Sequence, residues 1–173
     1  MEYNVNPDVK KPLMIVILTA AFGLALALTP TFLKSVPSYF FHLPAMLVFL
    51  VCILFLSRFV LTNYTYQLYD AANTMSNYPK LNIYRIRKSG SRMVYCIPFN
   101  NIQFVKRVDK IPKSSVPREN LCASLSPKEI YAVRYFVDGK PEEVYLECSA
   151  GFAAEIERRI NDYSEVIEEN AET

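Results

Sequence analysis

The stretch that decides the fold runs from Pro12 to Leu61 and reads PLMIVILTAAFGLALALTPTFLKSVPSYFFHLPAMLVFLVCILFLSRFVL. Residues 12–33 and 35–57 form two runs without Asp, Glu, Lys or Arg, separated only by Lys34. As a helix with about 1.5 Å of rise per residue, either run can cross a hydrocarbon core of about 30 Å. The sequence therefore predicts a transmembrane helical hairpin over residues 12–61, with helices at about 12–33 and 38–61.

The charges that flank these two runs predict the orientation of the hairpin. Lys10 and Lys11 precede the first run and Arg58 follows the second, whereas the tip around residues 34–38 carries Lys34 alone. Short segments rich in Lys and Arg stay on the cytoplasmic side of a membrane. We therefore expect a multi-pass protein of the cell membrane with both termini in the cytoplasm.

A cleaved signal peptide is the alternative interpretation of the first run. Two lysines precede it, and Ala25-Leu26-Ala27 has the small-x-small form of a cleavage site. Cleavage there would leave a short stub before the second run, with almost nothing translocated. An uncleaved hairpin is the simpler account of both runs.

The rest of the chain predicts one small β-rich domain over residues 62–167, between an N-terminal tail (1–11) and an acidic tail (168–173). Alternating apolar residues predict strands, and Ser89-Gly90-Ser91 and Asp138-Gly139 are hairpin turn signals. Phe152, Ile156, Ile160, Tyr163 and Ile167 form the apolar stripe of a C-terminal amphipathic helix. The expected strands lie at 62–69, 81–87, 93–99, 102–108, 130–137 and 143–148, with a short one near 121–125 inside a loop at 109–127.

This order of elements resembles the bacterial membrane proteins in which two transmembrane helices precede a pleckstrin-homology-type (PH-like) domain. The segments that carry the likeness are Thr62–Tyr66, Tyr84–Ile86 before a glycine turn, and Ile97–Ile102 leading to Val105. The resemblance implies an α+β membrane protein. Its helical hairpin would be followed by a PH-like antiparallel β-barrel or sandwich of six or seven strands and the C-terminal helix. It also implies a module that binds partners or membranes, and it supplies no catalytic residues.

The residues themselves give no pattern for catalysis, cofactor binding or metal binding. The chain has four glycines and one histidine, and it contains no phosphate-binding loop and no cluster of Cys and His. The four cysteines have no paired spacing, which favours buried, reduced thiols. The neighbouring carboxylates Glu142 and Glu143 follow a hairpin turn, where a solvated strand edge is expected. We therefore predict a protein that is not an enzyme and that has no cofactor.

Charge is divided unevenly along the β-rich domain. Residues 80–118 hold ten cations and one anion, whereas residues 119–173 hold five cations and thirteen anions. Solvated strand faces that interleave in the folded domain would explain this division, and so would a basic surface next to an anionic membrane leaflet. The candidate anionic-surface patch consists of Arg85, Arg87, Lys88, Arg92, Lys106 and Arg107.

Three functions are compatible with these features. The first is a membrane-anchored PH-like module that scaffolds or regulates other membrane or envelope proteins, with a membrane-associated protein as partner. The second is a domain that senses anionic lipid head groups at the inner leaflet. The third is an accessory subunit of a transporter or channel, because the uncharged helices can pack against a larger membrane protein. Nucleic acid is not an expected partner, because the basic segment has no recognition helix and no aromatic stacking motif.

Overall fold

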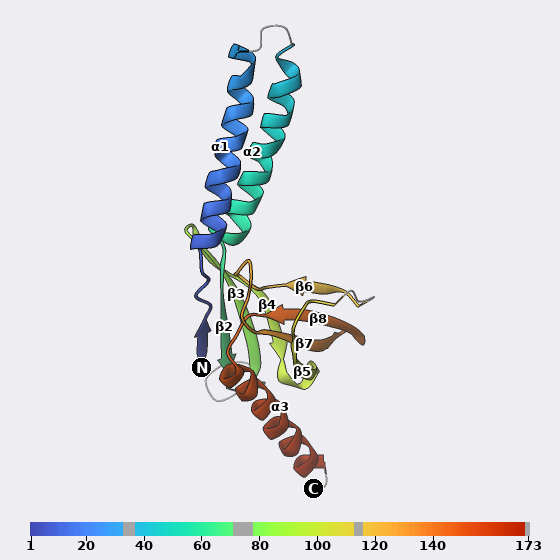
Figure 1. Cartoon of the computed structure of the whole chain (residues 1–173). Helices are drawn as coiled ribbons and strands as arrows, with labels where there is room; N and C mark the ends of the chain where they lie inside the picture. The colour runs from blue at the N-terminus through green and yellow to red at the C-terminus, as the bar shows by residue number, and fades with distance from the viewer. Residues whose placement is uncertain (33–36, 71–77, 113–115, 172–173) are drawn as a thin grey trace. The chain divides into compact units, whose positions relative to one another are not determined.

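The computed structural model describes residues 1–32, 37–70, 78–112 and 116–171, with side chains as far as Tyr163. It divides into two compact units (Figure 1). The helical unit comprises Asp8–Thr62, and the β unit comprises Met1–Pro7 together with Asn63–Thr173. Most of the predicted hairpin tip, residues 34–36, lies outside the described residues.

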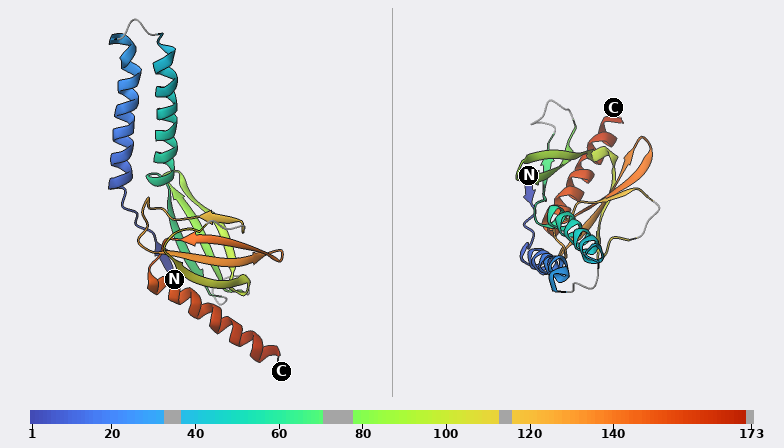
Figure 2. Two further views of the ribbon diagram at one scale, coloured as in Figure 1. Left: turned by 45° about the vertical axis from the view of Figure 1, so that its right-hand side comes forward. Right: turned by 90° about the horizontal axis from the view of Figure 1, so that it is seen from above.

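The helical unit contains the two predicted helices. α1 spans Lys10–Phe32 and α2 spans Tyr39–Phe59, and the two run side by side (Figures 1 and 2). Both are long and apolar enough to cross a membrane, and most of their large side chains are exposed. The prediction of two long apolar helices is therefore confirmed.

Small and polar side chains lie where α1 and α2 pack together. Gly23 and Cys52 are buried, and the Cys52 thiol donates a hydrogen bond to the Thr19 hydroxyl (Sγ–Oγ1 3.1 Å). A Cβ atom added at Gly23 would lie 3.1 Å from Cγ1 of Val48 and 3.4 Å from the Phe49 ring. Gly23 therefore sets how closely the helices approach, as small residues do in membrane helix pairs.

A bulky side chain at Gly23 is expected to loosen this helix pair. In a Thr19→Cys chain the new thiol faces Cys52, so oxidation should form a disulfide readily. Adding Gly23→Leu should slow that disulfide several-fold, because the leucine must displace Val48. Ala21→Leu, at an exposed position of the same helix, is the matched control and should leave the rate unchanged. Equal rates in the two variants would contradict the role given to Gly23.

The β unit is built from two four-stranded sheets, drawn from different sides in Figures 1 and 2. Sheet A has the order β1-β2-β3-β4 and is antiparallel, and sheet B has the order β5-β7-β8-β6. A short 3₁₀ helix, Phe99–Asn101, leads the chain from sheet A into sheet B. The strands are β1 Glu2–Asn4, β2 Asn63–Tyr69, β3 Lys80–Arg87, β4 Gly90–Pro98, β5 Ile102–Val108, β6 Arg118–Asn120, β7 Ile130–Val137 and β8 Lys140–Leu146.

Strand β1 comes from residues that the sequence analysis assigned to a separate N-terminal tail. Asn4 pairs with Thr65 of β2, and the Thr65 hydroxyl donates to the Asn4 side-chain oxygen (2.6 Å). On the inner face, the Tyr3 ring lies 5.1 Å from that of Phe152, and Val5, just beyond β1, is buried. The first residues of the chain are therefore part of sheet A.

The sequence predicts an antiparallel β-barrel or sandwich, and the described strands do not close into a barrel. The described strands form two separate sheets, because the 3₁₀ turn ends pairing at β4 before β5 begins. Sheet B also contains a parallel pair, since Arg118–Asn120 of β6 runs alongside Glu143–Tyr145 of β8. Eight strands are described: β1 is an addition from the N-terminal segment, and the short strand of the loop is β6 at Arg118–Asn120, whereas the sequence predicted it near 121–125. The coarser prediction of an α+β layout is confirmed.

Apolar side chains from the inner faces of both sheets form the main core, and α3 (Ala150–Ala171) covers part of it. Ser149 caps α3, accepting a hydrogen bond from the Phe152 amide at its hydroxyl oxygen (3.3 Å). Phe152 and Ile156 are fully buried, as the predicted stripe requires. The helix continues to Ala171, so most of the predicted acidic tail is helical, while residues 172–173 lie outside the described part.

The long loop between β5 and β7 has a structural role that the sequence did not reveal. Its segment around Cys122 and Ile111 packs with Ile130, Ala132 and Tyr145 in a second, smaller core. These strand residues alternate with those of the main core, so they lie on the outer face of sheet B. The loop therefore covers a sheet face that would otherwise be open to solvent.

Candidate functional site

The turn between β3 and β4 presents an exposed cluster of positive charge. Arg87, Lys88 and Arg92 are all exposed, and none makes an ion pair within the described part of the chain. Arg87 pairs with Gly90, whose φ of +133° suits a glycine. These three residues are the part of the predicted patch that the structure brings together, and we call them the basic turn.

Arg85, the fourth cation of this hairpin, is held by contacts within the protein. Its Nη2 lies 3.3 Å from a carboxylate oxygen of Glu119 in β6, and its guanidinium lies over the Tyr64 ring, 5.8 Å from the centroid. The other Glu119 oxygen accepts a hydrogen bond from the Tyr95 hydroxyl (2.5 Å). Arg85 therefore joins sheet A to sheet B, and the acidic second half of the chain neutralises it.

The remaining two residues of the predicted patch lie elsewhere. Lys106 and Arg107 are neighbours in β5 of sheet B, so their side chains point to opposite faces. Arg107 lies 3.7 Å from the Glu129 carboxylate, whereas Lys106 is exposed. The chain leaves sheet A for β5 next to the Lys80–Pro98 pair, which lies at the end of the β3–β4 hairpin far from the basic turn. The six predicted residues therefore do not form one surface.

Hydrogen bonds fix the position of the basic turn within sheet A. Ile86, next to Arg87, pairs with Asn63, the first residue of β2. The Asn63 side-chain amide (Nδ2) donates to the Val5 carbonyl (2.8 Å), and the backbone N–H of Val5 donates to the Tyr64 carbonyl (3.2 Å). Both chain segments that lead to the helical unit thus leave sheet A at the end where the basic turn lies.

A network of tyrosines and carboxylates joins the two sheets beside Arg85. The Tyr135 hydroxyl donates to Glu142 (2.9 Å), and the Tyr135 ring meets the Tyr95 ring edge-on at 6.4 Å between centroids. Burial, and then the neighbouring carboxylates, raise the pKa of both tyrosines well above the ordinary value. Both hydroxyls therefore stay protonated at neutral pH and act as hydrogen-bond donors that hold the sheets together.

A second polar cluster lies beneath the loop that covers sheet B. It is centred on Glu143, which the sequence predicts on a solvated strand edge. Glu143 is only 5% exposed and accepts hydrogen bonds from Arg134 (Nε–Oε1 2.8 Å) and from the Tyr145 hydroxyl (2.6 Å). Arg134 also stacks over the Phe104 ring, 4.8 Å from its centroid. Burial, and then the Glu143 carboxylate, raise the pKa of Tyr145 to about 12. The cluster is a satisfied structural ion pair.

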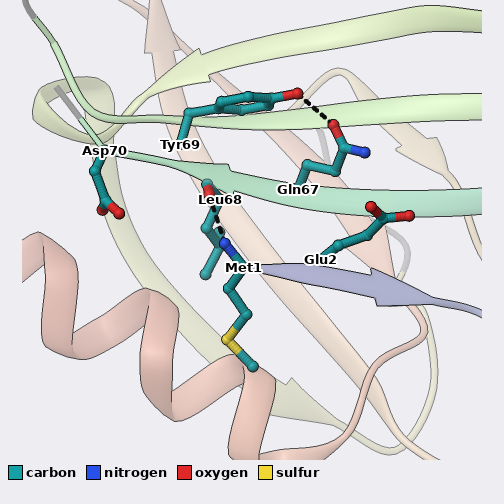
Figure 3. A pocket seen from close by; sticks show the side chains of 6 residues that line it. All are labelled: Met1, Glu2, Gln67, Leu68, Tyr69 and Asp70. Carbon is teal, nitrogen blue, oxygen red and sulfur yellow. Dashed lines mark hydrogen bonds between the residues drawn. The ribbon is translucent and has the colours of Figure 1, made fainter. Parts of the chain in front are cut away.

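A small surface pocket of about 290 Å³ lies beside β1 and the end of β2 (Figure 3). The Asp70 carboxylate at its rim is ion-paired with Arg159 of α3. The Gln67 side-chain oxygen accepts a hydrogen bond from the Tyr69 hydroxyl (2.6 Å), and the Met1 nitrogen donates to the Leu68 carbonyl (3.0 Å). Most polar groups of this pocket are thus engaged by the protein itself.

The four cysteines are free, and three of them are buried. Burial raises the pKa of the Cys148 thiol to about 12, which makes it a poor nucleophile at neutral pH. Cys96 is exposed on the outer face of sheet A, contrary to the buried position expected for it. Among the described residues no group of three His, Cys, Asp or Glu side chains is placed to hold a metal ion.

No family model, no curated protein and no solved structure matches this chain.

Proposed function

We propose that this chain is a membrane-anchored, PH-like interaction module without enzymatic activity. In this proposal α1 and α2 cross the membrane, and the β unit is held beside it to scaffold or regulate other membrane or envelope proteins. The observation that carries the proposal is the pairing of β1 with β2, whose residues lie on either side of the two apolar helices along the chain.

This pairing constrains the topology. Residues 2–4 and 65–67 belong to one sheet, so they must lie in the same aqueous compartment. The chain between them must then cross the membrane an even number of times, and a hairpin of two spans meets that condition. Lys10, Lys11 and Arg58 favour the cytoplasm as the shared compartment.

The position of β1 also argues against a cleaved signal peptide. Cleavage after Ala27 would remove Tyr3 and Val5, which pack into the core of the β unit. Tyr66, onto which Tyr3 stacks (centroids 6.2 Å apart, rings parallel within 1°), would lose that cover. An uncleaved N-terminal segment is consistent with the burial of these side chains.

The side-chain chemistry of the described residues supports a role in binding. Tyr95 and Tyr135 between the sheets have raised pKa values, and so does the buried Cys148 thiol, so none of them supplies an activated nucleophile or base.

Affinity purification of the tagged chain from its own membranes in mild detergent should recover a reproducible protein partner. Repeated recovery of the chain alone would count against the scaffold proposal.

An accessory subunit of a larger membrane protein is the second candidate. Most large side chains of α1 and α2 are exposed, including Phe22, Leu43 and Met46. Lipid can cover this apolar surface, and so can the helices of a channel or transporter. Recovery of one polytopic protein at constant stoichiometry in the same purification would favour this candidate over the scaffold.

Cysteine cross-linking tests the topology. Asn4→Cys and Thr65→Cys place two thiols on residues directly opposite each other across β1 and β2. In a Cys96→Ser background, oxidation of isolated membranes should link them within one chain, because such neighbours have Cβ atoms about 4.5–5.5 Å apart. The disulfide is detected as a reductant-sensitive linked peptide by mass spectrometry.

The control for this cross-link is the pair Glu2→Cys and Thr65→Cys, which is two residues out of register. Its yield should be much lower. Failure of the in-register pair to link, with the position-4 thiol labelled only from the outer face, would overturn the shared compartment.

A further inference from the structure

We propose that the basic turn, Arg87, Lys88 and Arg92, is a binding site for anionic phospholipid head groups. This inference rests on the proposed function, because it requires α1 and α2 to lie in a membrane. It departs from the six-residue patch that the sequence suggested, since the structure assigns Arg85, Lys106 and Arg107 to other places.

The charge of the turn is the first argument. Arg92 lies directly opposite Arg85 in the β3–β4 register, and like charges across strands repel. The Glu119 carboxylate neutralises the charge of Arg85. No described carboxylate forms an ion pair with the three cations of the turn. An external anion close to the turn would supply the missing countercharge.

The covalent tether is the second argument, and it selects a membrane over other anionic partners. α2 ends at Phe59 and β2 begins at Asn63, so only three residues separate them. Chain geometry limits the distance between Phe59 and Asn63 to about 14 Å. Ile86, at the base of the basic turn, pairs with Asn63. Because the tether is this short, Arg87 and Lys88 can approach an anionic leaflet beside the end of α2 to within the Debye length of about 8 Å over which the attraction acts.

The form of the turn indicates what kind of recognition to expect. Arg87, Lys88, Ser89 and Gly90 are all exposed at the tip of the β3–β4 hairpin. Such a surface responds to the density of negative charge in the leaflet, and it does not enclose one particular head group. Binding should therefore depend on the fraction of anionic lipid and on ionic strength.

The test uses the full chain in nanodiscs of phosphatidylcholine, with and without phosphatidylglycerol. An environment-sensitive fluorophore is attached at Ser91→Cys in a Cys96→Ser background, and its emission reports contact with the head-group region. We expect a blue shift with phosphatidylglycerol at low salt that is lost at high salt. The same fluorophore at Ser126→Cys, an exposed loop position, should show no such dependence.

Charge-matched variants decide which residues act. The triple variant Arg87→Gln, Lys88→Gln, Arg92→Gln should reduce the lipid-dependent shift at least threefold. The control triple Lys106→Gln, Lys128→Gln, Lys140→Gln removes equal charge from exposed positions elsewhere and should leave the shift in place. Arg85→Gln should also leave it in place, since Glu119 already holds that side chain.

Two outcomes would overturn the inference. A shift that is indifferent to phosphatidylglycerol, in a chain that does form the disulfide between positions 4 and 65 in membranes, would reject lipid binding and leave the proposed function standing. An equal loss in both triple variants would show that total charge acts and that the turn does not. Failure of the chain to stay in the membrane after alkaline extraction would instead count against the proposed function.

Discussion

The Glu143→Gln variant is expected to lose about 2 to 3 kcal/mol of the free energy of unfolding of the β unit. Glu143 is 5% exposed, and its carboxylate accepts hydrogen bonds from both Arg134 and Tyr145. Removing one partner of a buried ion pair leaves the other without compensation, and this penalty is larger than the net strength of the pair. Because the Arg134 side chain is 32% exposed, solvent compensates part of the loss.

The effect of Glu143 on stability should depend on pH. Burial by itself raises the pKa of Glu143, but hydrogen bonds from Tyr145 and Arg134 and the Arg134 charge outweigh it, so the pKa is lowered. A carboxyl group with a lowered pKa in the folded state contributes stability above its unfolded pKa and loses it as the pH falls through the folded value. The difference between wild type and Glu143→Gln should therefore shrink below about pH 4.

Amide hydrogen exchange of the full chain in nanodiscs measures both effects, with β7 and β8 as the reporting strands. Glu157→Gln, on the exposed side of α3, changes the same charge and should alter protection by less than about 0.5 kcal/mol. Equal losses in the two variants at neutral pH would show that the buried ion pair contributes nothing beyond total charge.

The double variant Tyr3→Ala, Val5→Ala is expected to cost about 3 kcal/mol and to expose the edge of β2. Val5 is 4% exposed, and Tyr3 packs against Tyr66 and Phe152, so alanine at both positions leaves cavities in the core. The loss should be concentrated in β2, because β1 lies at the edge of sheet A and pairs with β2.

Exchange of the β2 amides provides the measurement for this second variant. Glu2→Ala with Asn6→Ala changes two exposed residues of the same segment and should leave β2 protected. Unchanged protection in the Tyr3 and Val5 variant would mean that β1 is dispensable for sheet A, and the topological argument built on it would fail.

Local pattern was sufficient to predict the elements whose signal lies within one stretch of chain. The uncharged runs gave α1 and α2, alternation gave β2 and the two hairpins, and the Phe152 stripe gave α3. The Asp138-Gly139 turn is also as predicted, with both residues at positive φ. In each of these cases the residues that form the element also carry its periodicity.

Features that depend on contacts between residues far apart in the chain could not be predicted from the sequence. β1 has three residues, too few to show alternation, and its partner strand lies some 60 residues further along the chain, beyond any local signal. The Arg85–Glu119 ion pair depends on how two sheets pack, so the basic segment predicted a patch that the fold then divides. The burial of Leu121, Cys122 and Ala123 has a trace in the sequence as a consecutive apolar run within a polar loop. Consecutive burial of this kind indicates a segment covered on both sides.

The pairing of β1 with β2 also has a consequence for how the chain closes on itself. Joining the ends of a flexible segment of about 60 residues costs more than about 3 kcal/mol in loop-closure entropy. Here that segment consists largely of α1 and α2. Their packing at Gly23 brings the end of α2 back beside the start of α1. Helix pairing therefore lowers the entropic cost of docking β1, and β1 docking in turn favours helix pairing, because such coupling is reciprocal. A ligand or partner that separates the helices will therefore weaken the pairing of β1 with β2. One that stabilises this pairing will favour the packing of α1 against α2.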